Sequence, residues 1–190
     1  MFQQTLSTMF DASRAVLTRP AVATFEEYEK NDLQAATIYV AIGGLIAGVF
    51  GAIRASIQHS GVGSGIIGGI LGAIIGFYIY LGLVYLLGRA FGGTGQFGEL
   101  GYDLSLFTAP LTAVTSLLAI VPVLGGIAAL LLALYNIYLT YLGIQSGMNL
   151  PKDKAIYVMV IIFLIGLAIV ACFVLVLAGL FFAATQSTNP

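Results

Sequence analysis

Five long stretches of apolar residues dominate this chain of 190 residues. A helix needs about 20 mainly apolar residues to cross a hydrocarbon core about 30 Å thick, because each residue adds about 1.5 Å. The stretches cover residues 33–53, 65–87, 104–121, 124–144 and 155–183. We therefore expect an all-α fold, an integral membrane bundle of five transmembrane helices.

Charged residues are too few for a soluble domain. They make up 8% of the chain, against 59% hydrophobic residues, whereas soluble domains carry about 25% charged residues. A net charge of -1 provides no basic surface for nucleic acid. With one His and a single cysteine, Cys172, we expect no metal site, no cofactor and no internal disulfide. No catalytic constellation assembles along the chain, so we expect no enzyme.

Lysine and arginine are unevenly distributed between the connections of these stretches. With five spans, the N-terminal segment and the second and fourth connections share one side of the membrane. All eight acidic residues and six of the seven basic ones lie there, and Arg54 alone lies on the other side. The positive-inside rule then places the N-terminus in the cytosol and the tail outside it.

The first 32 residues carry apolar side chains at helical spacing and lack the basic start and continuous apolar core of a secretory signal. We expect an amphipathic helix at the cytosolic membrane surface, ending before Pro20. The alternative is that this segment packs against the cytosolic loops of the bundle, and the two are compatible. The apolar positions are Phe2, Leu6, Met9, Phe10, Val16 and Leu17.

Glycines recur in steps of four residues in the first two apolar stretches. Gly44 and Gly48 lie in the first stretch, and Gly61, Gly65 and Gly69 in or next to the second. In lipid, small residues let two helix backbones approach closely, so we expect these spans to cross tightly. Spare glycine faces could also line a path or join two copies of the chain.

The second connection and the following span, residues 89–110, contain the first group of candidate functional residues. The loop lacks the Lys-Ser/Thr ending of a phosphate-binding P-loop and follows no strand. We expect it to fold back onto the bundle, with Phe97, Leu100 and Phe107 toward lipid, Arg89 paired with an acidic residue of the group, and a kink at the proline. The candidates are Arg89, Gly92, Gly93, Gly95, Glu99, Gly101, Tyr102, Asp103 and Pro110.

The fourth stretch contains the second group: Asn136, Tyr138 and Tyr141, with Thr140 beside them. Polar side chains at this depth must face protein or a wet cavity. One interpretation is hydrogen bonding between helices. The other is a polar vestibule, open to the cytosol, that binds a head group or small solute. The fifth stretch is the most apolar and longer than a bilayer requires, so we expect it to be the most exposed to lipid.

The order of these features resembles the Yip family, the Ypt/Rab-interacting-protein domain of five-span membrane proteins. The resemblance extends over residues 17–177 and rests on Pro20 and Phe25, the glycine-rich connection followed by Pro110, a tyrosine-rich fourth span, and the sequence PKDKA at 151–155. It implies five spans and a cytosolic N-terminus. Eukaryotic relatives are linked to vesicle traffic, Rab GTPases and membrane shaping. The short N-terminal segment is similar to compact prokaryotic members, which implies the prokaryotic cell (inner) membrane.

We therefore expect a cytosolic segment over 1–32, a Yip-like membrane domain over 33–184, and an extracytosolic tail over 185–190. The leading hypothesis is a non-enzymatic protein that organises membrane or partner proteins. The alternative is permeation or transfer of a small solute or lipid through a polar cavity beside the fourth span. Expected partners are the lipid bilayer and a membrane-protein partner or a second copy, with no nucleic acid.

Overall fold

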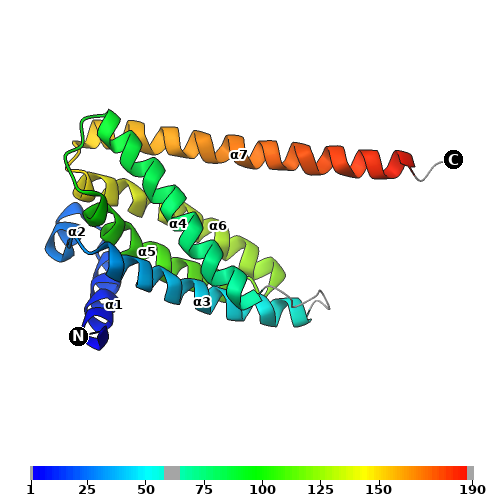
Figure 1. Cartoon of the computed structure of the whole chain (residues 1–190), viewed down its shortest axis with the longest axis horizontal. Coiled ribbons are helices and arrows are strands. Elements are labelled where there is room, and N and C mark those ends of the chain that lie inside the picture. Colours follow the sequence, from blue (N-terminus) through cyan, green and yellow to red (C-terminus); the bar gives the residue numbers. More distant parts are fainter. Residues whose placement is uncertain (1, 58–64, 188–190) are drawn as a thin grey trace.

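The computed structural model describes residues 2–57 and 65–187. These residues form seven α-helices and no strand, and Gly61 of the predicted glycine series lies outside them. Four helices, α3 to α6, form an antiparallel bundle; α1 and α2 cover one end, and α7 diverges from the bundle along its length (Figure 1). The helices are α1 (Phe2–Thr18), α2 (Val22–Tyr28), α3 (Leu33–Ile57), α4 (Gly65–Ala90), α5 (Phe97–Leu118), α6 (Pro122–Gly147) and α7 (Lys152–Ser187).

Four of these helices, α3, α4, α6 and α7, are long and apolar enough to cross a membrane. α5 is not among them, because it is less apolar and carries Glu99 and Asp103 near its start. It nevertheless runs the length of the bundle, from the end of α4 to the start of α6 (Figure 1). Much of α5 is buried by the surrounding helices, so its composition reflects protein neighbours more than lipid.

The crossing of α3 and α4 is built on glycine, as the four-residue spacing predicts. A Cβ atom at Gly48 would lie 2.6 Å from the carbonyl oxygen of Gly65, and one at Gly69 would lie 2.6 Å from the Cα of Gly48. Only glycine fits at this distance. A Cβ atom at Gly72 or Gly76 in α4 would have no neighbour within 4 Å. The close packing therefore uses the glycines at the start of α4 and not the later ones.

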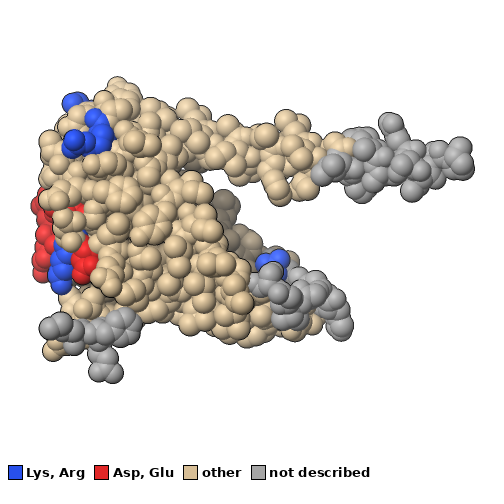
Figure 2. Space-filling view, in the orientation of Figure 1, with Lys and Arg blue, Asp and Glu red and all other residues tan. Residues whose placement is uncertain are grey.

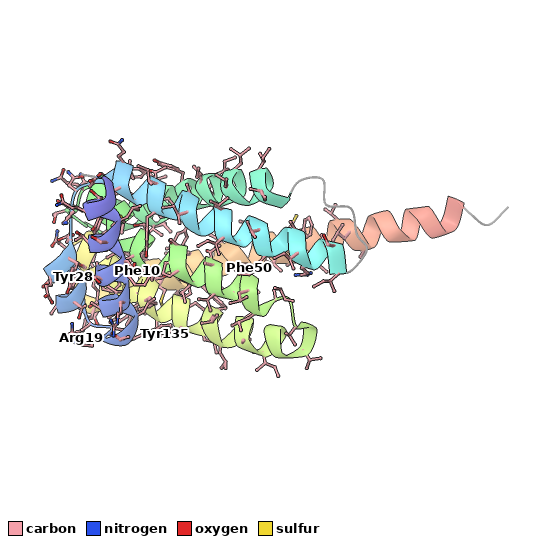
Figure 3. All side chains as sticks on the ribbon, turned by 90° about the horizontal axis from the view of Figure 1, so that it is seen from below. Phe10, Arg19, Tyr28, Phe50 and Tyr135 are labelled. Atoms are coloured by element: carbon pink, nitrogen blue, oxygen red, sulfur yellow. The ribbon has the colours of Figure 1, made fainter. Side chains whose placement is uncertain are left out.

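Helices α1 and α2 pack against one end of the bundle. Met9 and Val16 of α1 are fully buried, and the ring of Phe25 in α2 meets that of Phe107 edge to face at 6.1 Å. The Tyr135 hydroxyl donates to the Leu17 carbonyl oxygen over 2.7 Å. The segment therefore packs against the protein, as the alternative interpretation of the sequence expected, but these contacts are to α5 and α6 rather than to loops. α1 runs across the long axis of the bundle, and Figure 3 shows Phe10 on it.

The last helix has the least protein around it. Ala155 and Val158 are buried near its start, but every residue from Gly166 to Gly179 is exposed. α7 also extends beyond the ends of the other helices (Figure 1). The prediction that this segment is the most exposed is confirmed.

Charged side chains gather at one end of the molecule, over α1, α2 and the beginning of α7 (Figure 2). Arg89 ends α4 at this same end, whereas Arg54 lies in the last turn of α3, which runs to the opposite end. The uneven charge distribution of the sequence therefore becomes a separation along the long axis of the bundle.

Candidate functional site

The connection between α4 and α5 folds back onto the end of α6. The backbone N–H of Thr94 donates to the Met148 carbonyl oxygen over 3.0 Å. A side chain at Gly95 would overlap the backbone of Gly147, and one at Gly93 would lie 3.0 Å from the carbonyl oxygen of Met148. Gly92 adopts a φ of +89°, which side chains disfavour. The predicted folding back of this loop is confirmed, and its glycines are required by close approach and by one turn.

The predicted ion pair of Arg89 with Glu99 or Asp103 is wrong for the described structure. Arg89 donates instead to the Gly93 carbonyl oxygen over 3.2 Å. Glu99 closes a capping box at the start of α5, where its Oε2 accepts from the backbone N–H of Gln96 over 2.8 Å. The need to cap the start of α5 explains this choice, because unpaired N–H groups at a helix start are costly.

The capping residue also ties α5 to the segment before α3. The Asn31 side-chain amide donates to Gln96 Oε1 over 2.7 Å, and a side chain at Gly98 would overlap the Asn31 oxygen. Gly101 is similarly constrained, since a Cβ there would lie 2.8 Å from the Leu33 side chain. The loop and the first turn of α5 therefore form one docked unit with the α2–α3 link and the end of α6.

The expectation that Leu100 and Phe107 face lipid is wrong, because both side chains are fully buried in the protein. Phe97 packs edge to face against Tyr85 with ring centres 5.2 Å apart. Tyr102 is also buried. α5 continues through Pro110 to Leu118, as expected for a proline that does not end the helix.

Asp103 is fully buried. Neither of its carboxyl oxygens makes a hydrogen bond of ordinary geometry among the described residues, and the same holds for the hydroxyl of Ser146, although Ser146 lies close enough to interact with this carboxyl group. A Cβ at Gly147 would lie 3.3 Å from Asp103 Oδ2, so the end of α6 closes over this carboxyl group. A buried polar group without a partner costs free energy, which makes Asp103 an unusual position in the fold.

A second carboxyl group nearby has a related environment. Burial, together with the negative charges of Glu99 and Glu26, raises the pKa of Glu29 above its usual value. Its Oε1 atom is buried without a hydrogen-bond partner in the described part of the chain. Among the described residues, no group of His, Cys, Asp and Glu is arranged to hold a metal ion.

The polar residues of α6 divide between two directions. Thr140 is buried, and its hydroxyl lies 2.6 Å from that of Tyr80 in α4. The side-chain oxygen of Asn136 is buried and has no described partner. Tyr138, in contrast, is 45% exposed on the outside of the helix, and Tyr141 is half-buried against the core. The structure therefore brings Asn136 and Thr140 together with Tyr80 and leaves Tyr138 apart.

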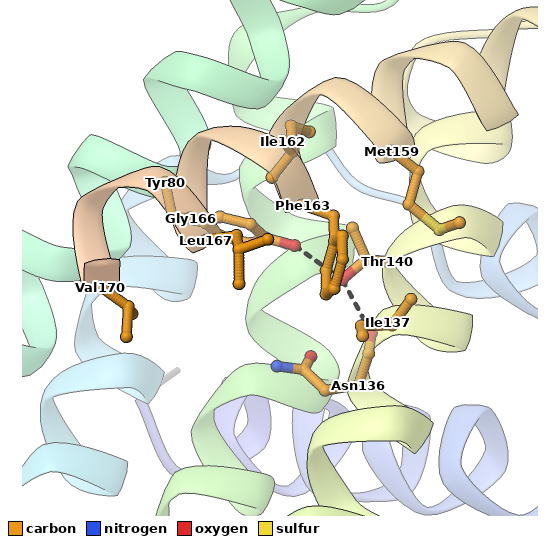
Figure 4. A pocket seen from close by; sticks show the side chains of 10 residues that line it. All are labelled: Tyr80, Asn136, Ile137, Thr140, Met159, Ile162, Phe163, Gly166, Leu167 and Val170. Atoms are coloured by element: carbon orange, nitrogen blue, oxygen red, sulfur yellow. Dashed lines mark hydrogen bonds between the residues drawn. The ribbon is translucent and has the colours of Figure 1, made fainter. Parts of the chain in front are cut away.

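Three hollows surround this polar group. One of about 390 Å³ lies between α4, α6 and α7 and is lined by Tyr80, Asn136 and Thr140 (Figure 4). A second, of about 420 Å³, lies between α3, α5 and α6 and shares Asn136. A third, of about 250 Å³, lies between α3, α4 and α5 and shares Tyr80 with the first and Thr108 and Thr112 with the second.

Tyr80, Thr108, Thr112 and Ser146 were not among the candidates from the sequence. Tyr80 had a weak signal: it lies 10 residues before the end of α4, Thr140 lies seven residues before the end of α6, and both ends lie on one side of the bundle. The threonines of α5 had none, since their hydroxyls can bond within their own helix, as Thr108 does with Leu104.

Comparison with protein families identifies the chain. Residues 14–174 match the family model of the Yip1 domain. The chain belongs to the Yip1 domain family. The match includes the docked α4–α5 loop, the polar residues of α6 and most of α7. Together with the four apolar helices, it makes this Yip1 domain part of an integral, multi-pass membrane protein. No curated protein and no solved structure was found to match the chain.

Proposed function

We propose that this Yip1-domain protein is a non-enzymatic organiser of other membrane proteins, with α7 as its main contact surface. The observation that carries the proposal is the exposure of α7 from Gly166 to Gly179. In membranes, helices associate through van der Waals packing of faces that are not already used within their own bundle. α7 has such a face, whereas α5 is enclosed.

The proposed topology has five spans, with α5 as the third, the N-terminus in the cytosol and the C-terminus outside it. The separation of charge along the bundle supports this orientation through the positive-inside rule. α5 supports the count, because it joins the end of α4 to the start of α6 at the opposite end. Its first turn is tied to the α2–α3 link by the Asn31–Gln96 hydrogen bond, and the turns that follow are largely buried.

The same topology gives α1 a place at the cytosolic membrane surface. α1 runs across the bundle axis, so it lies parallel to the membrane plane if the bundle axis follows the membrane normal. Met9 and Val16 face the bundle, while Phe10 is 66% exposed and available to enter the interfacial region. Packing against the bundle and contact with the membrane are therefore compatible for this helix.

Site-specific photocrosslinking in native membranes tests the organising function. A photoreactive phenylalanine derivative placed at Leu175 of α7, which is 72% exposed, is compared with one at Leu86 of α4, which is 69% exposed. We expect discrete protein adducts from position 175 and lipid adducts alone from position 86. The same adduct pattern from both positions would contradict α7 as the contact surface.

The second candidate function is transfer of a small solute or lipid. The three hollows that share Tyr80, Asn136, Thr108 and Thr112 support it, because a transfer path needs polar groups inside the bundle. Protein in liposomes should then accelerate lipid flip-flop or solute flux, and Asn136→Leu should slow it. Absence of any acceleration over protein-free liposomes would exclude this candidate.

A further inference from the structure

The hollow between α4, α6 and α7 is lined mainly by apolar side chains. Figure 4 shows side chains of α7 on one side and those of α4 and α6 on the other. Its volume of about 390 Å³ falls within the range of about 300–1,000 Å³ typical of ligand sites. The lining carries no charged residue; its polar side chains are Tyr80, Asn136 and Thr140, and α7 contributes Phe163, Gly166 and Leu167.

The hollow is accessible from the side of the molecule. Phe163 is 53% exposed and Leu167 is 56% exposed, and α7 diverges from the bundle beyond them (Figures 1 and 2). In a membrane protein the medium at this surface is the hydrocarbon of the bilayer. A ligand of the hollow can therefore enter from the lipid phase with its apolar part still outside.

One polar group of the hollow remains unpaired. Tyr80 and Thr140 satisfy each other, and Thr140 also donates to the Asn136 backbone carbonyl oxygen over 2.8 Å. The side-chain oxygen of Asn136 is buried without a partner among the described residues, so a ligand group in the hollow reaches it only when the lining side chains move apart. A carboxamide both accepts and donates hydrogen bonds, and a hydroxyl group does the same, so a hydroxyl is the smallest group that complements it.

The depth of Asn136 selects against a charged ligand. At about 1.5 Å per residue, Asn136 lies about 16 Å along α6 from the helix end at Gly147. That is about half of a hydrocarbon core of about 30 Å. A phosphate group at this depth, with no cation in the lining, would have a large desolvation cost. A single hydroxyl group has a much smaller one.

We propose that this hollow binds a neutral membrane lipid with a free hydroxyl group, such as a diacylglycerol, through a hydrogen bond to the Asn136 side chain. The acyl chains lie along α7 and extend into the bilayer. The proposal is independent of the organising function and of transfer, because a stationary bound lipid requires neither.

Photolabelling of the full-length protein tests this site. The protein is placed in vesicles of phosphatidylcholine and phosphatidylglycerol with a diacylglycerol that carries a diazirine in one acyl chain. We expect label in the peptide that contains residues 159–170. Asn136→Leu keeps a similar volume but removes the hydrogen bond, and should lower the labelling about threefold. Methylation of the lipid hydroxyl should lower it by a similar factor.

Two further variants separate ligand binding from folding. A Cβ at Gly166 meets nothing within 4 Å, and Gly166 lines the hollow, so Gly166→Leu should fill it and reduce labelling without a packing clash. Gly179→Leu places the same side chain at an equally open position of α7 outside the lining and should change nothing. Tyr138→Phe is the matched control on α6.

Equal labelling of the wild type, Asn136→Leu and Gly166→Leu would overturn the proposal, as would label spread over the exposed part of α7. Circular dichroism of each variant confirms that any loss of label occurs in folded protein.

Discussion

The hydroxyl groups of Tyr80 and Thr140 lie 2.6 Å apart, although 60 residues separate them in the sequence. This contact joins α4 to α6 in the middle of the bundle and forms part of the wall of the hollow between α4, α6 and α7. The side chain of the neighbouring Asn136 takes no part in this contact, and its oxygen is buried without a partner among the described residues.

Removal of the Tyr80 hydroxyl should destabilise the bundle modestly. Hydrogen bonds between membrane helices contribute about 0.6 kcal/mol on average, so Tyr80→Phe should lower the free energy of unfolding by about that amount. Unfolding in mixed micelles with added SDS measures it. A double-mutant cycle with Thr140→Val should give a coupling of similar size, and Tyr138→Phe serves as the exposed control. A coupling of zero would contradict an energetic role of this contact.

Substitution of Gly48 should separate α3 from α4. A Cβ there lies 2.6 Å from the Gly65 carbonyl oxygen, so Gly48→Ala should cost about 1–3 kcal/mol of stability through backbone displacement. Gly72→Ala in α4 meets nothing within 4 Å and should be neutral or slightly stabilising. The same SDS titration compares them; equal stability of the two variants would show that α3 and α4 are less closely packed.

Gly95→Ala should detach the α4–α5 loop from α6. The new methyl group would overlap the backbone of Gly147, and the Thr94–Met148 hydrogen bond would be lost with the docked conformation. Hydrogen exchange at Thr94 and proteolytic cleavage within the loop should both become faster. Gly82→Ala, at an open position of α4, is the control. Unchanged exchange in Gly95→Ala would refute the docked loop.

Glu29 should make the protein less stable as the pH rises. Because its pKa in the folded protein is raised, the folded state holds the proton more tightly than the unfolded state. Its contribution to stability is therefore present below the usual glutamate pKa and is lost as the pH rises through the raised value. Glu29→Gln should flatten this part of the stability–pH curve, whereas Glu27→Gln, on an exposed neighbour, tests the effect of charge alone. Stability–pH curves of identical slope for the wild type and Glu29→Gln would rule out this contribution of Glu29.

Cysteine accessibility distinguishes five spans from four. Thr94 and Val121 flank α5 and are both exposed. In a Cys172→Ala background, a membrane-impermeant maleimide added to intact cells should label Val121→Cys and Ser56→Cys, while Thr94→Cys should react only in inverted vesicles. Labelling of positions 94 and 121 from the same side would show that α5 does not cross the membrane.

The sequence predicted the helical architecture correctly where a residue pattern had only one physical explanation. Glycines four residues apart predicted the close crossing at Gly48 and Gly65, and the long apolar stretch predicted the exposed α7. It was insufficient where several partners compete for one group. Glu99 could pair with Arg89 or cap α5, and only the folded arrangement shows that it caps the helix. Likewise, Phe107 was expected to face lipid, but Phe25, from a distant segment of the chain, packs against its ring.

The attachment of α7 at one end has a mechanical consequence. Among the described residues, its buried side chains lie near its start, at Ala155 and Val158, and Tyr157 stacks on Phe91 with ring centres 6.2 Å apart. The helix is therefore held at the charged end of the molecule, and its remaining length can tilt about that end. Longer or shorter acyl chains in the surrounding bilayer change the tilt of such a helix. Each change of tilt alters the spacing between Leu167 and Asn136, so the thickness of the bilayer and the affinity of the hollow for the proposed lipid should be coupled.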